Sequence, residues 1–209
     1  MMNQLLHYFP SITKQQEEQF LTFADAFRDW NQKINLISRK DIDNLFEHHI
    51  LHSLAIDKVL HFKSDSSVLD VGTGGGFPGI PLAILMPNVH FCLIDSIGKK
   101  ITAASDMVKT IGLHNVCLKQ LRCEEEKGKY DFVVSRAVMP LKELHQLIRK
   151  NISPIQQNAL PNGLISLKGG DVTAETAPFT KIVSVYSLSE FFTEPFFATK
   201  KAIYLPIKA

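Results

Sequence analysis

The glycine-rich segment at residues 68–81 constrains the fold of this chain more than any other feature. It reads VLDVGTGGGFPGIP, the pattern of a buried strand, an acid, a tight turn and the start of a helix. Glycines turn the chain sharply and let its backbone come close to a ligand. Free N–H groups at the start of the following helix face the same crevice. The segment therefore predicts a ligand site at the carboxyl end of a strand in an open α/β sheet.

Two strand-end acids indicate what that ligand is. Asp70 ends the first predicted strand and suits hydroxyls or an amine better than bare phosphate. Asp95 and Ser96 follow the next predicted strand, where a carboxylate can accept both ribose hydroxyls of an adenosine. Dinucleotide-binding folds also place an acid about 20 residues after their glycines. However, the Gly-x-Gly-x-x-Gly match here begins at Gly74, whereas Gly72 is the glycine that follows the strand directly. We therefore predict S-adenosylmethionine as the ligand, with NAD as the alternative.

Strand and helix patterns alternate from residue 67 onward. We expect strands near 67–71, 89–94, 115–119, 130–135 and 163–168, and helices near 79–86, 98–111 and 141–150. Such alternation predicts a parallel sheet with helices on both faces. Two late strands, near 181–186 and 202–206, have no clear helix between them and predict an antiparallel hairpin at the sheet edge. This mostly parallel, seven-stranded α/β layout is typical of methyltransferases rather than dehydrogenases.

The first 63 residues have a helical pattern of their own. Thr13 and Gln16 fit a capping box, and aromatic residues at 20, 23, 27 and 30 form an apolar stripe that indicates a packed helix face. After a turn at 31–39, Asp41 or Asp43 is expected to cap a second helix that runs to about Leu60. We predict an N-terminal helical extension at 1–63 and a catalytic domain at 64–209.

The composition indicates the size of the fold and the cellular compartment of the protein. A chain of 209 residues supports one sizeable core with a small extension. Its formal net charge of +2 is too small to indicate nucleic-acid binding by itself. Three cysteines without a Cys-x-x-Cys motif favour a reducing compartment, and the most apolar stretch, 80–86, is too short to cross a membrane. We expect a cytoplasmic protein without a membrane anchor.

Histidines and cations supply further candidate site residues. His48 and His52 have the i, i+4 spacing of a metal pair, but no third ligand accompanies them, so no metal site is predicted. Arg136 ends the fourth predicted strand, where it could hold a carboxylate or a base edge, or form a structural ion pair. Lys168 ends the fifth and could contact an RNA phosphate or be an ordinary surface lysine. From the residues alone, the acidic segment around Glu124 is best interpreted as a solvent-exposed helix start.

These motifs together resemble the bacterial 16S ribosomal RNA guanine-N7 methyltransferase family, historically called glucose-inhibited division protein B. The similarity covers nearly the whole chain, and the glycine segment with its two prolines is its most specific part. The matching motifs are Trp30-Asn31 with Asn35-Leu36, His49 in HILHS, residues 70–81, residues 93–100, residues 122–125, residues 135–137 and residues 167–169. His52 departs from the family pattern, since many members have an acid there, and Cys123 replaces a small or aliphatic residue.

The resemblance implies a Rossmann-like, class I S-adenosylmethionine-dependent methyltransferase acting on a guanine of 16S rRNA. It implies donor contacts at Gly72, Phe77, Cys123, Glu124 and Arg136. The full predicted site adds Asp70, Thr73, Gly74, Asp95 and Ser96 as donor-binding residues, His49 and Lys168 as substrate residues, and Arg136 as the catalytic residue. The implied partner is 16S rRNA or a small-subunit particle. The sequence does not determine the oligomeric state, and we favour a monomer. A methyltransferase for a small molecule or another RNA, and an NAD-linked oxidoreductase, are the alternatives.

The implied chemistry is a direct methyl transfer. Guanine N7 carries an in-plane lone pair and no proton, so no proton-abstracting base is needed. The enzyme must align N7, the methyl carbon and sulfur, and exclude water. We expect the guanine to be exposed in or flipped from a loop, because the major groove of duplex RNA is too narrow for a protein site.

Overall fold

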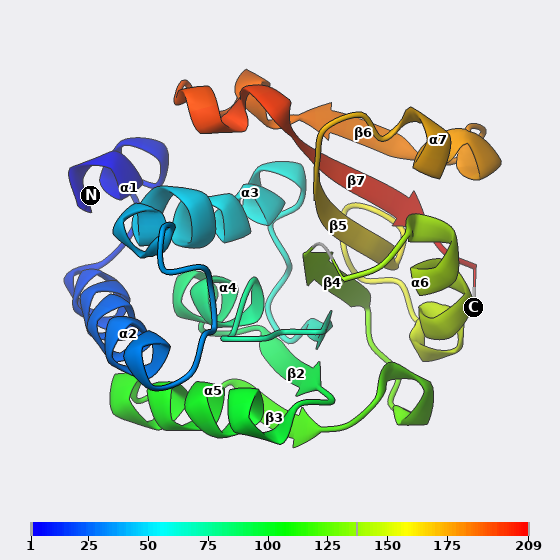
Figure 1. Ribbon diagram of the computed structural model, residues 1–209. Helices are drawn as coiled ribbons and strands as arrows, with labels where there is room; N and C mark the ends of the chain where they lie inside the picture. Colours follow the sequence, from blue (N-terminus) through cyan, green and yellow to red (C-terminus); the bar gives the residue numbers. More distant parts are fainter. Residues whose placement is uncertain (1, 137, 209) are drawn as a thin grey trace.

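A single sheet forms the centre of the computed structural model, which describes residues 2–136 and 138–208 (Figure 1). The strand order is β3-β2-β1-β4-β5-β7-β6. The strands are β1 (Ser67–Val71), β2 (His90–Asp95), β3 (Val116–Gln120), β4 (Phe132–Arg136), β5 (Gly163–Gly169), β6 (Ser184–Ser187) and β7 (Lys200–Pro206). The first five strands pair in parallel, and β7 pairs antiparallel with both β5 and β6. The predicted parallel sheet with a C-terminal antiparallel hairpin is confirmed.

Alternation along the strands builds a hydrophobic layer on each face of the sheet. Val68 and Val134 belong to one cluster of buried side chains, whereas their neighbours Leu69 and Val133 belong to another. Such alternation follows from the two-residue period of a strand. The first cluster packs under α4 (Gly79–Leu85) and α5 (Gly98–Ile111), and the second under α6 (Leu141–Ile148). Helices therefore cover both faces, and α7 (Thr173–Thr176) packs beside α6.

The N-terminal helices pack on the α4 and α5 side of the sheet (Figure 1). They comprise α1 (Met2–Tyr8), α2 (Lys14–Lys33), the 3₁₀ turn η1 (Ile42–Asn44), η2 (Leu45–Leu51) and α3 (His52–Val59). The predicted capping box of Thr13 and Gln16 is present at the start of α2. The Gln16 amide also donates to the carbonyl oxygens of Ile84 and Leu85 at 2.8 and 3.0 Å, which ties α2 to the end of α4. The division of the chain at residue 63 stays a prediction.

The second N-terminal helix differs from the expectation of one α-helix. It begins as a 3₁₀ turn, continues as a π-helix over η2, and becomes α-helical at His52. Helical periodicity in a sequence does not separate these forms, because they differ only in the carbonyl that each N–H group reaches. The π-helix matters for the site, since it carries His48 and His49.

Short 3₁₀ turns complete the chain. They are η3 (Cys123–Glu125), η4 (Arg149–Asn151), η5 (Ala177–Phe179), η6 (Leu188–Glu190) and η7 (Pro195–Thr199). Of these, η4 continues the helix predicted near 141–150 after α6 ends at Ile148. The strand expected at 181–186 begins later, at Ser184. Within the described part of the chain, no helix combines the length and the apolar character needed to cross a membrane.

Candidate active site

The glycine turn after β1 brings backbone to the carboxyl edge of the sheet. Gly72, Gly74 and Gly76 have φ angles of +70°, +57° and +98°, a region that other residues rarely adopt. The N–H groups of Gly72 and Thr73 both donate to the Ile94 carbonyl, at 2.9 and 3.0 Å, so the turn is fastened to β2. A Cβ atom at Gly72 would lie 2.6 Å from the side chain of Val138. The positive φ therefore favours glycine here, and any side chain would also have to displace Val138.

A cavity of about 390 Å³ opens beside this turn. Its walls come from the ends of β1, β2 and β4 and from η3, which are the positions predicted for a ligand in a parallel sheet. The lining residues are Val71, Gly72, Ile94, Asp95, Ser96, Lys100, Leu121, Arg122, Cys123, Glu124, Arg136, Val138 and Met139. Six predicted donor-binding residues are thus brought together: Gly72, Asp95, Ser96, Cys123, Glu124 and Arg136.

Asp95 is held in a fixed orientation at the edge of this cavity. Its Oδ2 atom accepts the Gly74 N–H and its Oδ1 atom accepts the Ile97 N–H, both at 2.9 Å. Each carboxylate oxygen has two lone pairs, so acceptor capacity remains for hydroxyl groups of a ligand. The sequence predicted Asp95 as a ribose acceptor, and the structure adds that it also anchors the glycine turn through Gly74.

Asp70 lies behind the glycine turn rather than on the cavity wall. Its side chain is fully buried, and Oδ2 accepts the Gly79 N–H at 2.9 Å, which fastens the start of α4. Burial raises the pKa of the Asp70 carboxyl to about 7. Thr73 and Phe77 are buried as well and do not line the cavity. These three residues therefore lie buried in or beside the glycine turn, and their predicted contacts with the methyl donor stay predictions.

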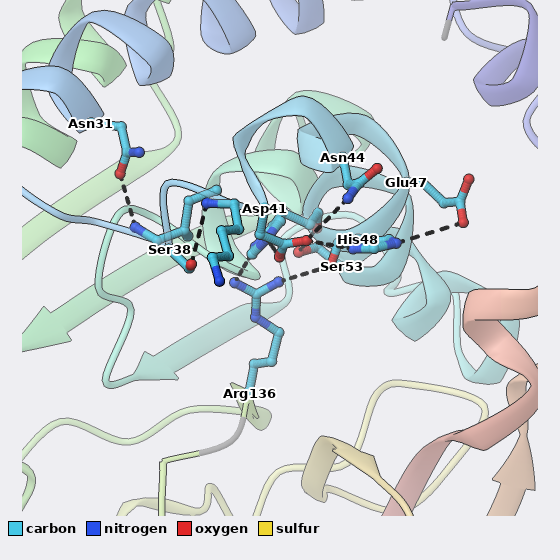
Figure 2. Close-up of polar contacts among 11 residues, drawn as sticks. Asn31, Ser38, Asp41, Asn44, Glu47, His48, Ser53 and Arg136 are labelled. Atoms are coloured by element: carbon cyan, nitrogen blue, oxygen red, sulfur yellow. Dashed lines mark hydrogen bonds and ion pairs between the residues drawn. The ribbon is translucent and has the colours of Figure 1, made fainter.

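Arg136 is a partly buried cation at the end of β4, and it joins the cavity to the N-terminal helices. One guanidinium nitrogen, Nη2, lies 3.0 Å from His49 Nδ1, and the group sits 4.7 Å above the Phe77 ring. Burial lowers the pKa of Arg136 to about 10, so it stays charged at neutral pH. Figure 2 shows this side chain reaching from the sheet toward Asp41 and His48. Arg136 is thus placed to meet a ligand on one side and a fixed histidine on the other.

No group of three or more His, Cys, Asp or Glu side chains is placed to hold a metal ion within the described residues, and the absence of a metal site stays a prediction. His48 Nδ1 contacts Asp41 Oδ1 at 2.6 Å, while His52 is buried with an Nε2 atom that has no hydrogen-bond partner among the described residues. His48 also stacks on Phe196 with ring centroids 3.9 Å apart. The i, i+4 spacing brings two histidines onto one face only in an α-helix, whereas His48 lies in the π-helix η2.

Lys168 is less exposed than a rim cation would be. Its side chain is 10% exposed, its ammonium group lies 2.9 Å from Glu175, and it donates to the Met139 carbonyl at 2.7 Å. Met139 lines the cavity beside the glycine turn, so Lys168 supports one of its walls. The predicted phosphate contact of Lys168 stays a prediction. Sequence reasoning missed two other cations, Lys100 and Arg122, although both stand within motifs that matched the family.

Comparison with known proteins identifies the family. The family model for rRNA small subunit methyltransferase G matches residues 16–201. The chain belongs to this family. Relatives named ribosomal RNA small subunit methyltransferase G include one from Bacteroides fragilis, 58% identical over 99% of this chain and 100% of its own length. One from Flavobacterium johnsoniae is 49% identical over 99% of both chains. The resemblance inferred from the motifs is confirmed.

Solved structures confirm the fold class. A SAM-dependent methyltransferase from Aquifex aeolicus matches with a TM-score of 0.56, covering 81% of this chain and 98% of its own, at 19% identity. A mutant of MtNAS in complex with S-adenosylmethionine matches with a TM-score of 0.59, covering 88% and 72%, at 11% identity. At these identities the similarity concerns the fold. The family assignment therefore depends on the methyltransferase G relatives.

Proposed function

We propose that this protein transfers a methyl group from S-adenosylmethionine to N7 of a guanine in a loop of bacterial 16S rRNA. The observation that carries the proposal is similarity along almost the entire chain to relatives named small-subunit rRNA methyltransferases. The cavity at the carboxyl edge of the sheet supports it, since its residues suit a donor that bears hydroxyls and a carboxylate. We propose 16S rRNA or a small-subunit particle as the substrate and a monomer as the active form.

The residues around the cavity fit such a donor. Asp95 has free lone pairs for ribose hydroxyls, and the backbone of Gly72 lines the same cavity. Arg136 offers a fixed planar set of donors to a carboxylate or to the oxygen of a guanine. When bound, S-adenosylmethionine supplies a methyl group activated by the positive sulfur. The protein's task is to hold that methyl group in line with N7 and to exclude water.

The transfer to N7 requires no base from the protein. His49 lies beside Arg136, but both of its ring nitrogens are engaged, Nε2 with Asp41 and Nδ1 with Arg136. Burial, reinforced by the Arg136 charge, lowers the pKa of His49 to about 4. His49 is therefore neutral at physiological pH and has no free nitrogen to accept a proton. A neutral His49 that cannot act as a base is consistent with methylation of guanine N7, because N7 already carries a free lone pair.

An in vitro methylation assay tests the proposal. The purified protein would be incubated with isotope-labelled S-adenosylmethionine and small-subunit particles from a strain that lacks the methyltransferase. We expect label in 16S rRNA and none in large-subunit RNA incubated in parallel. Label in a small molecule with no transfer to RNA would instead support the small-molecule alternative, and tight NAD binding without donor binding would support the oxidoreductase.

A further inference from the structure

Asp41, which the sequence suggested only as a possible helix cap, lies between two consecutive histidines, His48 and His49. Its Oδ1 atom lies 2.6 Å from His48 Nδ1, and its Oδ2 atom lies 2.6 Å from His49 Nε2. Figure 2 shows the carboxylate facing the helix that carries both rings. That helix, η2, is a seven-residue π-helix. π-Helical segments are rare and occur frequently at functional sites.

The chemistry of the two neighbours fixes the protonation of His49. A carboxylate only accepts hydrogen bonds, so His49 Nε2 must carry the proton that points at Asp41. A guanidinium only donates, so His49 Nδ1 must be the lone pair that receives Arg136 Nη2 at 3.0 Å. The His49 side chain is 11% exposed, so little water can replace either partner. Asp41 and Arg136 thus require the same neutral tautomer of His49.

The carboxylate is itself held in place by the loop that precedes it. Asn31 is buried near the end of α2, and its Oδ1 atom accepts the N–H groups of Leu36 and Ile37, each at 2.9 Å. The Asp41 N–H donates to the Ser38 carbonyl at 2.9 Å. A chain of contacts therefore runs from α2 through this loop to the π-helix and on to the donor cavity.

We propose that Asp41 is a positioning residue, which acts through His49 to hold the Arg136 guanidinium at the wall of the donor cavity. This inference rests on the proposed function, because it assigns Arg136 to the donor. The alternative is that Asp41 only joins the loop to η2 and contributes stability. The two differ in one respect, namely whether the effect of Asp41 depends on Arg136.

A double-mutant cycle on donor binding separates these cases. The variants are Asp41→Asn, which keeps the size of the side chain, Arg136→Lys, and the combination of both, with donor dissociation constants measured by calorimetry. Asp41→Asn should weaken donor binding about tenfold, the scale expected when a fixed side chain regains rotamer freedom. Because both changes disable one interaction, the double variant should bind about as weakly as Arg136→Lys alone. Independent, multiplicative losses would overturn the proposal.

Conservative replacement of His49 gives a second test. His49→Gln retains one donor and one acceptor, whereas His49→Phe retains neither, so Gln should preserve much more donor affinity than Phe. Equal affinities for the two variants would contradict the relay. Asp57→Asn is the matched control, since Asp57 makes the same 2.6 Å contact with a histidine, His61, whose side chain is 70% exposed. The control should bind the donor as wild type does.

The same variants distinguish failure of this inference from failure of the proposed function. If the wild-type protein does not bind S-adenosylmethionine, the proposed function and this inference fall together. If wild type binds the donor and methylates 16S rRNA while Asp41→Asn does both equally well, only the positioning role falls. If Asp41→Asn lowers the melting temperature yet leaves the donor affinity of the folded protein unchanged, the role of Asp41 is purely structural.

Discussion

Replacing His49 with glutamine should change how the stability of the protein depends on pH. The ordinary pKa of a histidine is 6.5, and burial together with the Arg136 charge lowers that of His49 to about 4. The folded state therefore disfavours the proton that the unfolded chain accepts. The stability that the protein gains by keeping His49 neutral is complete above pH 6.5, and it is lost as the pH falls toward 4. In the variant this loss should be absent.

The size of the effect follows from the difference between the two pKa values. One pH unit corresponds to about 1.4 kcal/mol, so a pKa lowered from 6.5 to about 4 corresponds to about 3 kcal/mol. Asp70 acts in the opposite direction in nearly the same range. Burial raises its pKa to about 7, so its contribution is lost as the pH rises. The diagnostic quantity is therefore the difference between wild type and His49→Gln, in which the Asp70 contribution cancels.

Urea unfolding of both proteins across pH 4 to 7 measures that difference. We expect the free energy of unfolding of wild type to fall relative to the variant by about 3 kcal/mol as the pH drops through this range. His61→Gln serves as the control for losing a histidine, since its exposed side chain is solvated in both states. A difference between wild type and His49→Gln that stays constant with pH would refute the assigned neutral, buried state of His49.

Three further predictions concern donor binding, the turn and the chemical step. Asp95→Ala should weaken S-adenosylmethionine binding by about 1–3 kcal/mol, because hydroxyls and two backbone N–H groups lose their acceptor; unchanged affinity in calorimetry would remove Asp95 from the site. Gly72→Ala should destabilise the fold by about 1–3 kcal/mol through strain at positive φ, and a urea midpoint equal to wild type would contradict this. Single-turnover methylation at saturating substrate should be nearly flat across neutral pH, because N7 carries no proton. A rate that rises steeply and loses this trend in His49→Ala would make His49 a base.

The sheet and the position of the cavity at its carboxyl edge were largely predictable because their signals are local. The glycine turn, the apolar strands and the strand-end position of Asp95 all lie in short segments, and parallel sheets place such strand ends together. The same reasoning could not tell whether a strand-end acid faces the cavity or lies behind the turn. Asp70 lies behind it, because its carboxylate accepts the Gly79 N–H.

The contacts between distant segments were not predictable in this way. Asp41 was expected only as a possible helix cap, and its contacts with two consecutive histidines depend on the π-helical backbone. Lys168 was weighed as a surface cation, but its partner Glu175 lies in a segment with no strong pattern. Such side-chain partnerships are set by tertiary packing, which a single sequence does not encode locally.

Mapping the methylated atom tests the central claim most directly. Small-subunit particles methylated by the purified protein would be digested, and the nucleosides and fragments analysed by mass spectrometry against unmethylated particles. We expect 7-methylguanosine at one position in a loop of 16S rRNA, absent when Arg136→Ala replaces wild type. A methyl group on an exocyclic amine or a ribose hydroxyl, or no methyl group on 16S rRNA at all, would contradict the account.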